Sequence, residues 1–168
     1  MPTRFFCLNI LATQANTTKN ERSIDMREDT IHLLKECNAG AKMGVESIDE
    51  ILDKTETEDL KKILAISKVE HNEIIKRTGE ILAKNHIESN RPDAIAKFMS
   101  KMKTELKLMS GNADSKIAEL MTDGCDMGIK SLTQYLNDYS TAEESVKDLT
   151  GKLIRIEEST REKLKAYL

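Results

Sequence analysis

The chain has 168 residues, which is enough for one domain with a buried core. Charged residues make up 33% of the chain and aromatic residues 4%, with no Trp and two Pro, a composition typical of all-α proteins and unlike that of sheet proteins. A net charge of −3 without a long Lys/Arg cluster argues against a nucleic-acid-binding protein, and no apolar run is long enough to span a membrane.

Three cysteines, Cys7, Cys37 and Cys125, are scattered along the chain. They are too few and too far apart for a zinc site or a disulfide framework, so we interpret them as free thiols. Their odd number, together with the lack of a convincing export signal, predicts a cytoplasmic protein.

Residues 1–25 show no helical period. Their apolar run, residues 5–12, resembles the core of a secretory signal, but it is short, contains Asn9 and follows a single positive charge. We expect residues 1–25 to be a disordered tail, or an upstream extension of the reading frame with Met26 as the true start. The domain is therefore predicted to cover residues 26–168.

Helical periodicity begins after Met26 and predicts a first helix over about residues 27–54. Its apolar and small residues recur at spacings of three and four, namely Ile31, Leu34, Cys37 or Asn38, Ala41, Val45, Ile48 and Leu52. Thr55 and Glu58 predict a capping box in a short turn. A second helix is predicted over about residues 58–85, with Lys68 and His71 one turn apart on its apolar stripe.

A break follows at about residues 85–93, because Pro92 and the two residues before it stop a helix. The pattern of residues 93–109 then predicts a shorter, Met-rich amphipathic helix that carries the chain back along the other helices. Two more helices are predicted, over about residues 113–138 and within residues 142–168.

The first and third long helices contain an internal repeat. Gly40 to Leu52 recurs as Gly124 to Leu136, with Gly, Met, Gly, Ser and Leu at matching places. Mid-helix glycine costs roughly 1 kcal/mol relative to alanine, so two glycines in each copy predict close packing against a neighbour. That neighbour is either the backbone of another helix or a bulky side chain from it.

Two helix pairs with this repeat and a long connection between them resemble the ferritin-like superfamily, and its rubrerythrin-like branch in particular, over residues 28–168. The resemblance implies an antiparallel four-helix bundle with a helical crossover between its second and third helices. It also implies a di-metal centre, held by one inward glutamate on each of two helices and by Glu-x-x-His on each of the other two.

The sequence departs from that ligand set at nearly every position. When Gly44 and Gly128 are matched to the small residues that follow the two single glutamates, the glutamate positions hold Ala41 and Cys125. The Glu-x-x-His positions hold Lys68 with His71 in the second helix, and Arg155 with Glu158 in the last one. The site is therefore predicted to be degenerate, with His71 as the one matching ligand.

We hypothesise that a buried polar network replaces the metals. In this network Lys68 and Arg155 stand near the former cation positions, Glu158 or Glu157 supplies the opposite charge, and His71 forms a hydrogen bond. The alternative is that Lys68 and Arg155 extend to solvent and that His71 is a core histidine with its hydrogen bonds satisfied.

Two functions follow from these expectations. In the first, the chain binds no cofactor and is a structural or protein-interaction module, expected to form a homodimer, with its protein partner left open. In the second, it is an oxidoreductase or iron-handling protein that binds iron or manganese at relocated carboxylates, such as Glu36, Glu70, Glu73, Asp123 and Glu157. The second function rests on fold resemblance alone.

Overall fold

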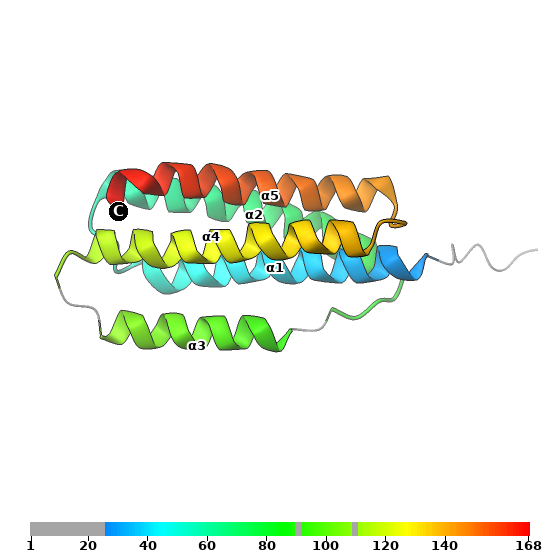
Figure 1. The fold of residues 1–168 in the computed structure, drawn as a ribbon, viewed down its shortest axis with the longest axis horizontal. Coiled ribbons are helices and arrows are strands. Elements are labelled where there is room, and N and C mark those ends of the chain that lie inside the picture. The colour runs from blue at the N-terminus through cyan, green and yellow to red at the C-terminus, as the bar shows by residue number, and fades with distance from the viewer. Residues whose placement is uncertain (1–25, 90–91, 109–110) are drawn as a thin grey trace, which may run out of the picture.

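The structure, a computed structural model, describes residues 26–89, 92–108 and 111–168. Within these ranges it consists of α1 (Glu28–Leu52), α2 (Glu58–Lys84), α3 (Asp93–Lys107), α4 (Ala113–Asp138), α5 (Glu144–Leu164) and a final 3-10 turn, η1 (Lys165–Tyr167), with no strand (Figure 1). The all-α prediction is confirmed, and the helix bounds agree with those expected to within a few residues. The tail predicted for residues 1–25 lies outside the described residues.

The four long helices lie side by side (Figure 1). α1 packs on α2 and α4 packs on α5, and the two pairs meet where α2 contacts α5 and where α1 contacts both α4 and α5. The chain runs in the same direction along α2 and α4, because α3 returns it to the end of the molecule at which α2 began (Figure 1). None of the described helices is long and apolar enough to cross a membrane.

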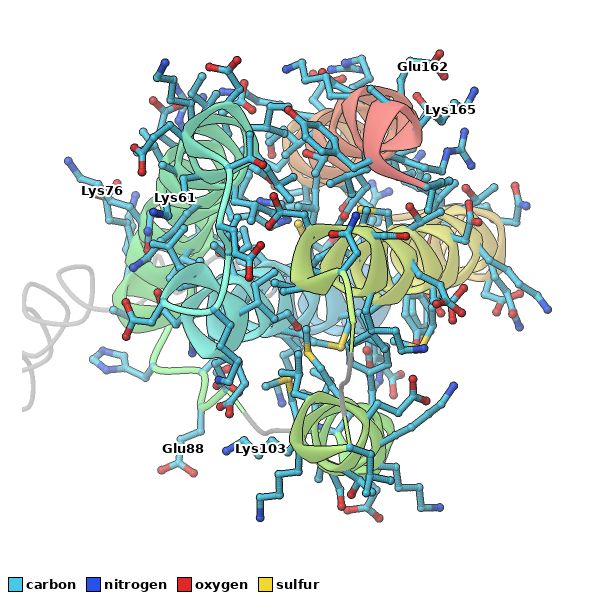
Figure 2. The ribbon with its side chains drawn as sticks, turned by 90° about the vertical axis from the view of Figure 1, so that its left-hand side faces the viewer. Lys61, Lys76, Glu88, Lys103, Glu162 and Lys165 are labelled. Atoms are coloured by element: carbon cyan, nitrogen blue, oxygen red, sulfur yellow. The ribbon has the colours of Figure 1, made fainter. Side chains whose placement is uncertain are left out.

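α3 lies outside the other four helices, alongside α1 (Figures 1 and 2). It buries one apolar face, made of Ile95, Met99, Met102 and Leu106. These side chains join a cluster that also contains Met43 of α1 and Met121 of α4. The flexible, unbranched Met side chain adapts to an irregular gap, so the Met content of α3 is explained by packing.

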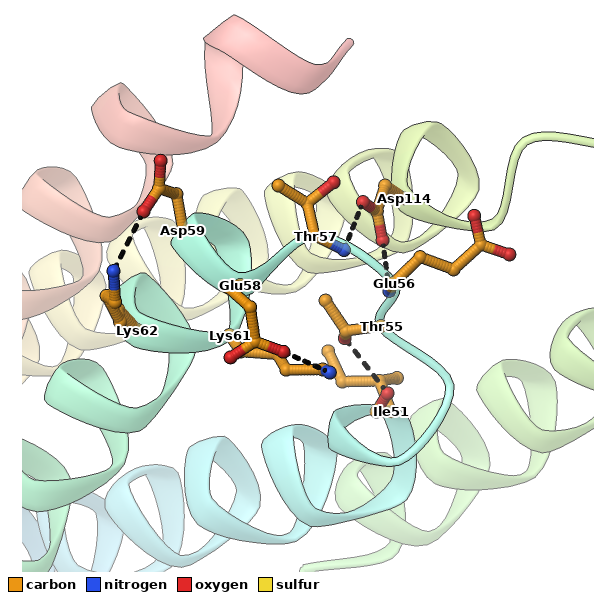
Figure 3. Close-up of polar contacts among 9 residues, drawn as sticks. All are labelled: Ile51, Thr55, Glu56, Thr57, Glu58, Asp59, Lys61, Lys62 and Asp114. Carbon is orange, nitrogen blue, oxygen red and sulfur yellow. Dashed lines mark hydrogen bonds and ion pairs between the residues drawn. The ribbon is translucent and has the colours of Figure 1, made fainter.

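The turn between α1 and α2 is held by a carboxylate from α4. Asp114 is 6% exposed, and its two oxygens accept hydrogen bonds from the backbone N–H groups of Glu56, at 2.8 Å, and Thr57, at 2.9 Å (Figure 3). The predicted capping box is wrong: the Thr55 hydroxyl donates back to the carbonyl of Ile51 at 3.1 Å, and α2 begins after Thr57. The backbone N–H groups of the two residues just before α2, Glu56 and Thr57, are bonded to Asp114 instead.

The turn between α4 and α5 is held in the same way from α1. Asp29 accepts hydrogen bonds from the backbone N–H of Thr141 at 3.1 Å and from its hydroxyl at 2.6 Å. The Thr30 hydroxyl accepts one from the N–H of Glu143 at 3.0 Å. Each helix pair therefore secures the turn of the other pair with an aspartate from the first turn of its leading helix.

Candidate functional site

The centre of the molecule contains a histidine whose two ring nitrogens are both bonded. His71 of α2 is 1% exposed. Its Nδ1 lies 2.7 Å from the carbonyl oxygen of Ser67, and its Nε2 lies 3.1 Å from Oε1 of Glu157 on α5. Since a carbonyl only accepts, Nδ1 carries a proton, and a second proton lies between Nε2 and the carboxyl group. The pair is therefore either imidazolium with carboxylate or two neutral groups.

Two buried hydroxyl groups, those of Ser67 and Thr160, lie about one helical turn from His71 and Glu157, respectively, and form a second contact between α2 and α5. Glu157 is 7% exposed. The hydroxyl of Thr160, one turn further along α5, lies 2.9 Å from the hydroxyl of Ser67, so α2 and α5 are joined at two levels. Polar groups buried here thus have partners within the protein, which is the condition for burying them at low cost.

Burial and hydrogen bonding act in opposite directions on His71. Burial alone would lower the pKa of this histidine, but the hydrogen bond and the charge of Glu157, together with the hydrogen bond to the Ser67 carbonyl, outweigh burial and raise the pKa above its ordinary value. Compared with a histidine in water, His71 therefore favours its protonated form, in which the Nε2 proton is donated to Glu157.

The two described cysteines are free and buried. Burial and the nearby carboxylate of Glu157 raise the pKa of the Cys125 thiol, and burial raises the pKa of Cys37 to about 11. Both thiols are therefore protonated at neutral pH, whereas a nucleophilic cysteine requires a stabilised thiolate.

The second glycine of each repeat makes room for one member of the buried pair. A Cβ atom on Gly44 would lie 2.4 Å from Cδ2 of His71, and a Cβ on Gly128 would lie 3.3 Å from Oε1 of Glu157. The first glycines of the repeats also face side chains: Gly40 faces two leucines, and Gly124 faces Phe98 at 3.1 Å. Of the two explanations for the repeated glycines, the structure supports admission of side chains.

The structure brings only some of the predicted site residues together. Ala41 and Cys125 are buried as expected. Lys68 is not in the core, and the hypothesis of a buried Lys68 is wrong: this side chain is 33% exposed and forms an ion pair with Asp49 of α1. Arg155 and Glu158 are exposed as well. A lysine stem reaches water readily, so exposing its ammonium costs less than burying it.

These positions do not fit a di-metal centre. A metal of this kind needs several carboxylate and imidazole ligands that converge, whereas Ala41 offers no ligand atom and His71 and Glu157 bond to each other. Among the carboxylates proposed for a relocated site, Asp123 is exposed and Glu73 pairs with Lys152 at 3.1 Å. Among the described residues, no group of three or more His, Cys, Asp or Glu side chains is placed to hold a metal ion.

Sequence reasoning missed the hydroxyl groups of the centre. Ser67 lies four residues before His71, and Thr160 lies three residues after Glu157, so each shares a helix face with a member of the pair. A second buried polar contact was missed too, in which the amide of Asn38 donates to the hydroxyl of Thr78 at 2.8 Å. Small polar residues within an apolar stripe were the available signal.

The sequence matches no protein-family model, and a comparison with curated proteins also finds no match.

Proposed function

We propose that the chain is a ferritin-like helical bundle without a di-metal centre and that it acts in the cytoplasm by binding another protein chain through its outer surface. Two helix pairs joined by a helical crossover support the ferritin-like assignment. The free thiols of Cys37 and Cys125 are compatible with a reducing compartment.

The observation that carries the proposal is how the centre is filled. The buried pair contains His71, the one residue that the resemblance matches to a metal ligand, and each member of the pair lies against a glycine of the repeat, Gly44 or Gly128. A metal ion would have to displace the hydrogen bond that satisfies both groups. The same helix that supplies His71 exposes Ile66 and Val69 on its outer face, at 54% and 62%. Two exposed apolar side chains one turn apart, on a helix whose opposite face is already packed, support a contact with another protein.

Metal analysis of untagged protein, purified after growth with iron and manganese, tests the proposal. We expect far less than one ion per chain, because no described set of side chains converges on a metal position. A content of about two ions per chain, the complement of di-metal bundles, would overturn the proposal in favour of an oxidoreductase or iron-handling protein.

A matched variant separates the centre from the surface. The double substitution H71L/E157L replaces the buried pair by apolar side chains, a change that is often tolerated when both partners are removed together. If the role of the chain lies on its surface, this variant keeps the association behaviour of the parent in sedimentation. Loss of association with the fold retained would place the functional element in the centre.

A further inference from the structure

The outer face of α2 carries a continuous stripe of exposed residues. We call it the α2 stripe, and it consists of Asp59, Lys62, Ile66, Val69, Glu73 and Lys76. The members follow one another at alternating spacings of three and four residues, the period with which a helix presents a seam to a second helix in a coiled coil. Asp59 and Lys62 lie at the start of this face (Figure 3), and Lys76 points away from the other helices (Figure 2).

The α2 stripe is apolar at its middle and charged towards both ends. Ile66 and Val69 are 54% and 62% exposed, although α2 buries a full apolar stripe of its own against α1 and α5. α2 has 27 residues and is about 40 Å long, which gives a second helix enough length to pack along it. The charges around the apolar centre then decide which helix fits.

We propose that the occupant is the α2 helix of a second copy of this chain, packed antiparallel about a twofold axis between Ile66 and Val69; this inference deepens, and rests on, the proposed function. Around that axis Ile66 faces Val69 of the second copy. Lys62 faces Glu73 of the second copy, and Asp59 faces Lys76 of the second copy. Each contact occurs twice, so the stripe is complementary to itself at every level.

The charges select this orientation. In a parallel pair, each residue would face its own copy, which places Lys62 against Lys62 and Glu73 against Glu73. Like charges in contact are destabilising, so the parallel arrangement is disfavoured at every charged level of the α2 stripe.

The ion pairs that these residues make within one chain do not oppose the contact. Lys62 pairs with Asp59 at 3.0 Å, and Glu73 pairs with Lys152 at 3.1 Å. Asp59, Lys62 and Glu73 are well exposed and Lys152 is partly exposed, and ion pairs of this kind contribute little, so they exchange for contacts to a second copy at small cost. Burial of Ile66 and Val69 supplies the net driving force.

Sedimentation of the full chain at low salt, over about 1–200 μM, tests the inference. We expect a reversible dimer with a Kd in the micromolar range, since only the two central levels are apolar. The substitution Ile66→Lys should weaken the dimer by at least about tenfold, because it buries a charge in the apolar centre. Leu108→Lys is the matched control, as Leu108 is 77% exposed but lies outside α2, and it should leave the Kd unchanged.

A charge swap tests the orientation. Lys62→Glu alone and Glu73→Lys alone each create two like-charge contacts and should weaken the dimer about tenfold or more, whereas the double variant restores opposite charges and should return to within about threefold of the parent. Lys61→Glu is the control, because Lys61 forms the same kind of ion pair with Glu58, at 2.7 Å, beside the stripe.

Three results would overturn the inference: a chain that remains monomeric at 200 μM, a dimer that Ile66→Lys leaves intact, or single and double charge variants that weaken the dimer additively. If the chain is monomeric, the α2 stripe does not bind a second copy, and its partner would be a different protein. This outcome is independent of the metal analysis, which tests the proposed function: a monomer without metal refutes only self-association, and a dimer with bound metal refutes only the metal-free role.

Discussion

His71 on α2 and Glu157 on α5 meet at 3.1 Å in the buried centre, although 86 positions separate them in the sequence. Gly44 and Gly128, the second glycines of the internal repeat, lie against the ring and the carboxylate, respectively. The second glycine therefore has the same role in both copies of the repeat. The first helix of each pair, α1 or α4, has no side chain at the point where the second helix, α2 or α5, places a buried polar side chain. Glycine lowers the helix propensity at these positions, but it leaves room for the His71 ring and the Glu157 carboxylate.

Substitution of single glycines tests this reading. In Gly44→Ala, the new Cβ would approach the His71 ring to 2.4 Å, so the ring must move and its hydrogen bonds are strained. We expect a loss of about 1–3 kcal/mol in the free energy of unfolding. Gly40→Ala on the same helix is the control: its Cβ would meet Leu132 and Leu153 at an ordinary 3.7 Å, so helix propensity should make it neutral or up to about 1 kcal/mol more stable. Urea denaturation followed by circular dichroism measures both, and equal effects would contradict the interpretation.

A double-mutant cycle tests whether His71 and Glu157 depend on each other. His71→Leu or Glu157→Leu alone leaves a buried polar group without its partner and should cost about 3–5 kcal/mol, while the double variant should lie much closer to the parent. Additive losses would show that the two groups are stabilised independently. Lys68→Met serves as a control and should change stability by less than about 1 kcal/mol, since its ion pair with Asp49 is partly exposed.

The helices were predictable from sequence because each carries a long apolar period, and two of them also begin at a strong local signal. α3, for example, begins directly after Pro92, and α4 begins after Asn112, whose side chain accepts a hydrogen bond from the N–H of Ser115 at 3.2 Å. Signals of this kind act within a few residues, so one sequence is enough to read them.

The centre was only partly predictable because two neighbouring registers fit the same stripe. On α2, Ser67 and Lys68 both lie near one turn before His71, and on α5 Glu157 and Glu158 are adjacent. Adjacent helix residues point about 100° apart, so a shift of one position exchanges a buried side chain for an exposed one. The packing of α2 on α5, where the Thr160 hydroxyl meets Ser67, decides between them, and no local pattern contains that information.

Stability should depend on pH through His71. Its pKa in the folded protein is raised above the ordinary 6.5 by Glu157, so the folded state holds the proton more tightly than the unfolded state does. The contribution of the pair is therefore complete below pH 6.5 and is lost as pH rises through the raised pKa of the folded state. Denaturation of the parent, measured between pH 5 and 9, should show that the free energy of unfolding begins to fall above pH 6.5.

Glu157→Gln supplies the matching control for the pH effect. Without the carboxylate, burial dominates and lowers the pKa of His71, so the histidine contribution should now increase with pH up to about 6.5. His32 and His86 are present in both proteins, and the difference between the two pH profiles therefore isolates His71. Parallel profiles would show that Glu157 does not control the protonation of His71.

The aspartates that hold the two turns, Asp114 and Asp29, should contribute differently to the free energy of unfolding. Asp114 is 6% exposed and accepts two backbone hydrogen bonds, so Asp114→Asn, which keeps the shape but removes the charge, should cost about 1–3 kcal/mol. Asp29→Asn at the other turn should cost less, because Asp29 is more exposed.

Acid provides the decisive measurement for Asp114. Burial alone would raise the pKa of this carboxyl group, but the hydrogen bonds from Thr57 and Glu56 lower it below the ordinary 3.8. A lowered pKa in the folded state gives stability that is fully present above pH 3.8 and is lost as pH falls through the folded value. The difference in stability between the parent and Asp114→Asn should therefore be constant above about pH 5 and should shrink below pH 4. A difference that persists unchanged to pH 2 would show that the variant loses stability because one acceptor oxygen is replaced by an NH2 group, which cannot accept a hydrogen bond, and not because the charge is lost.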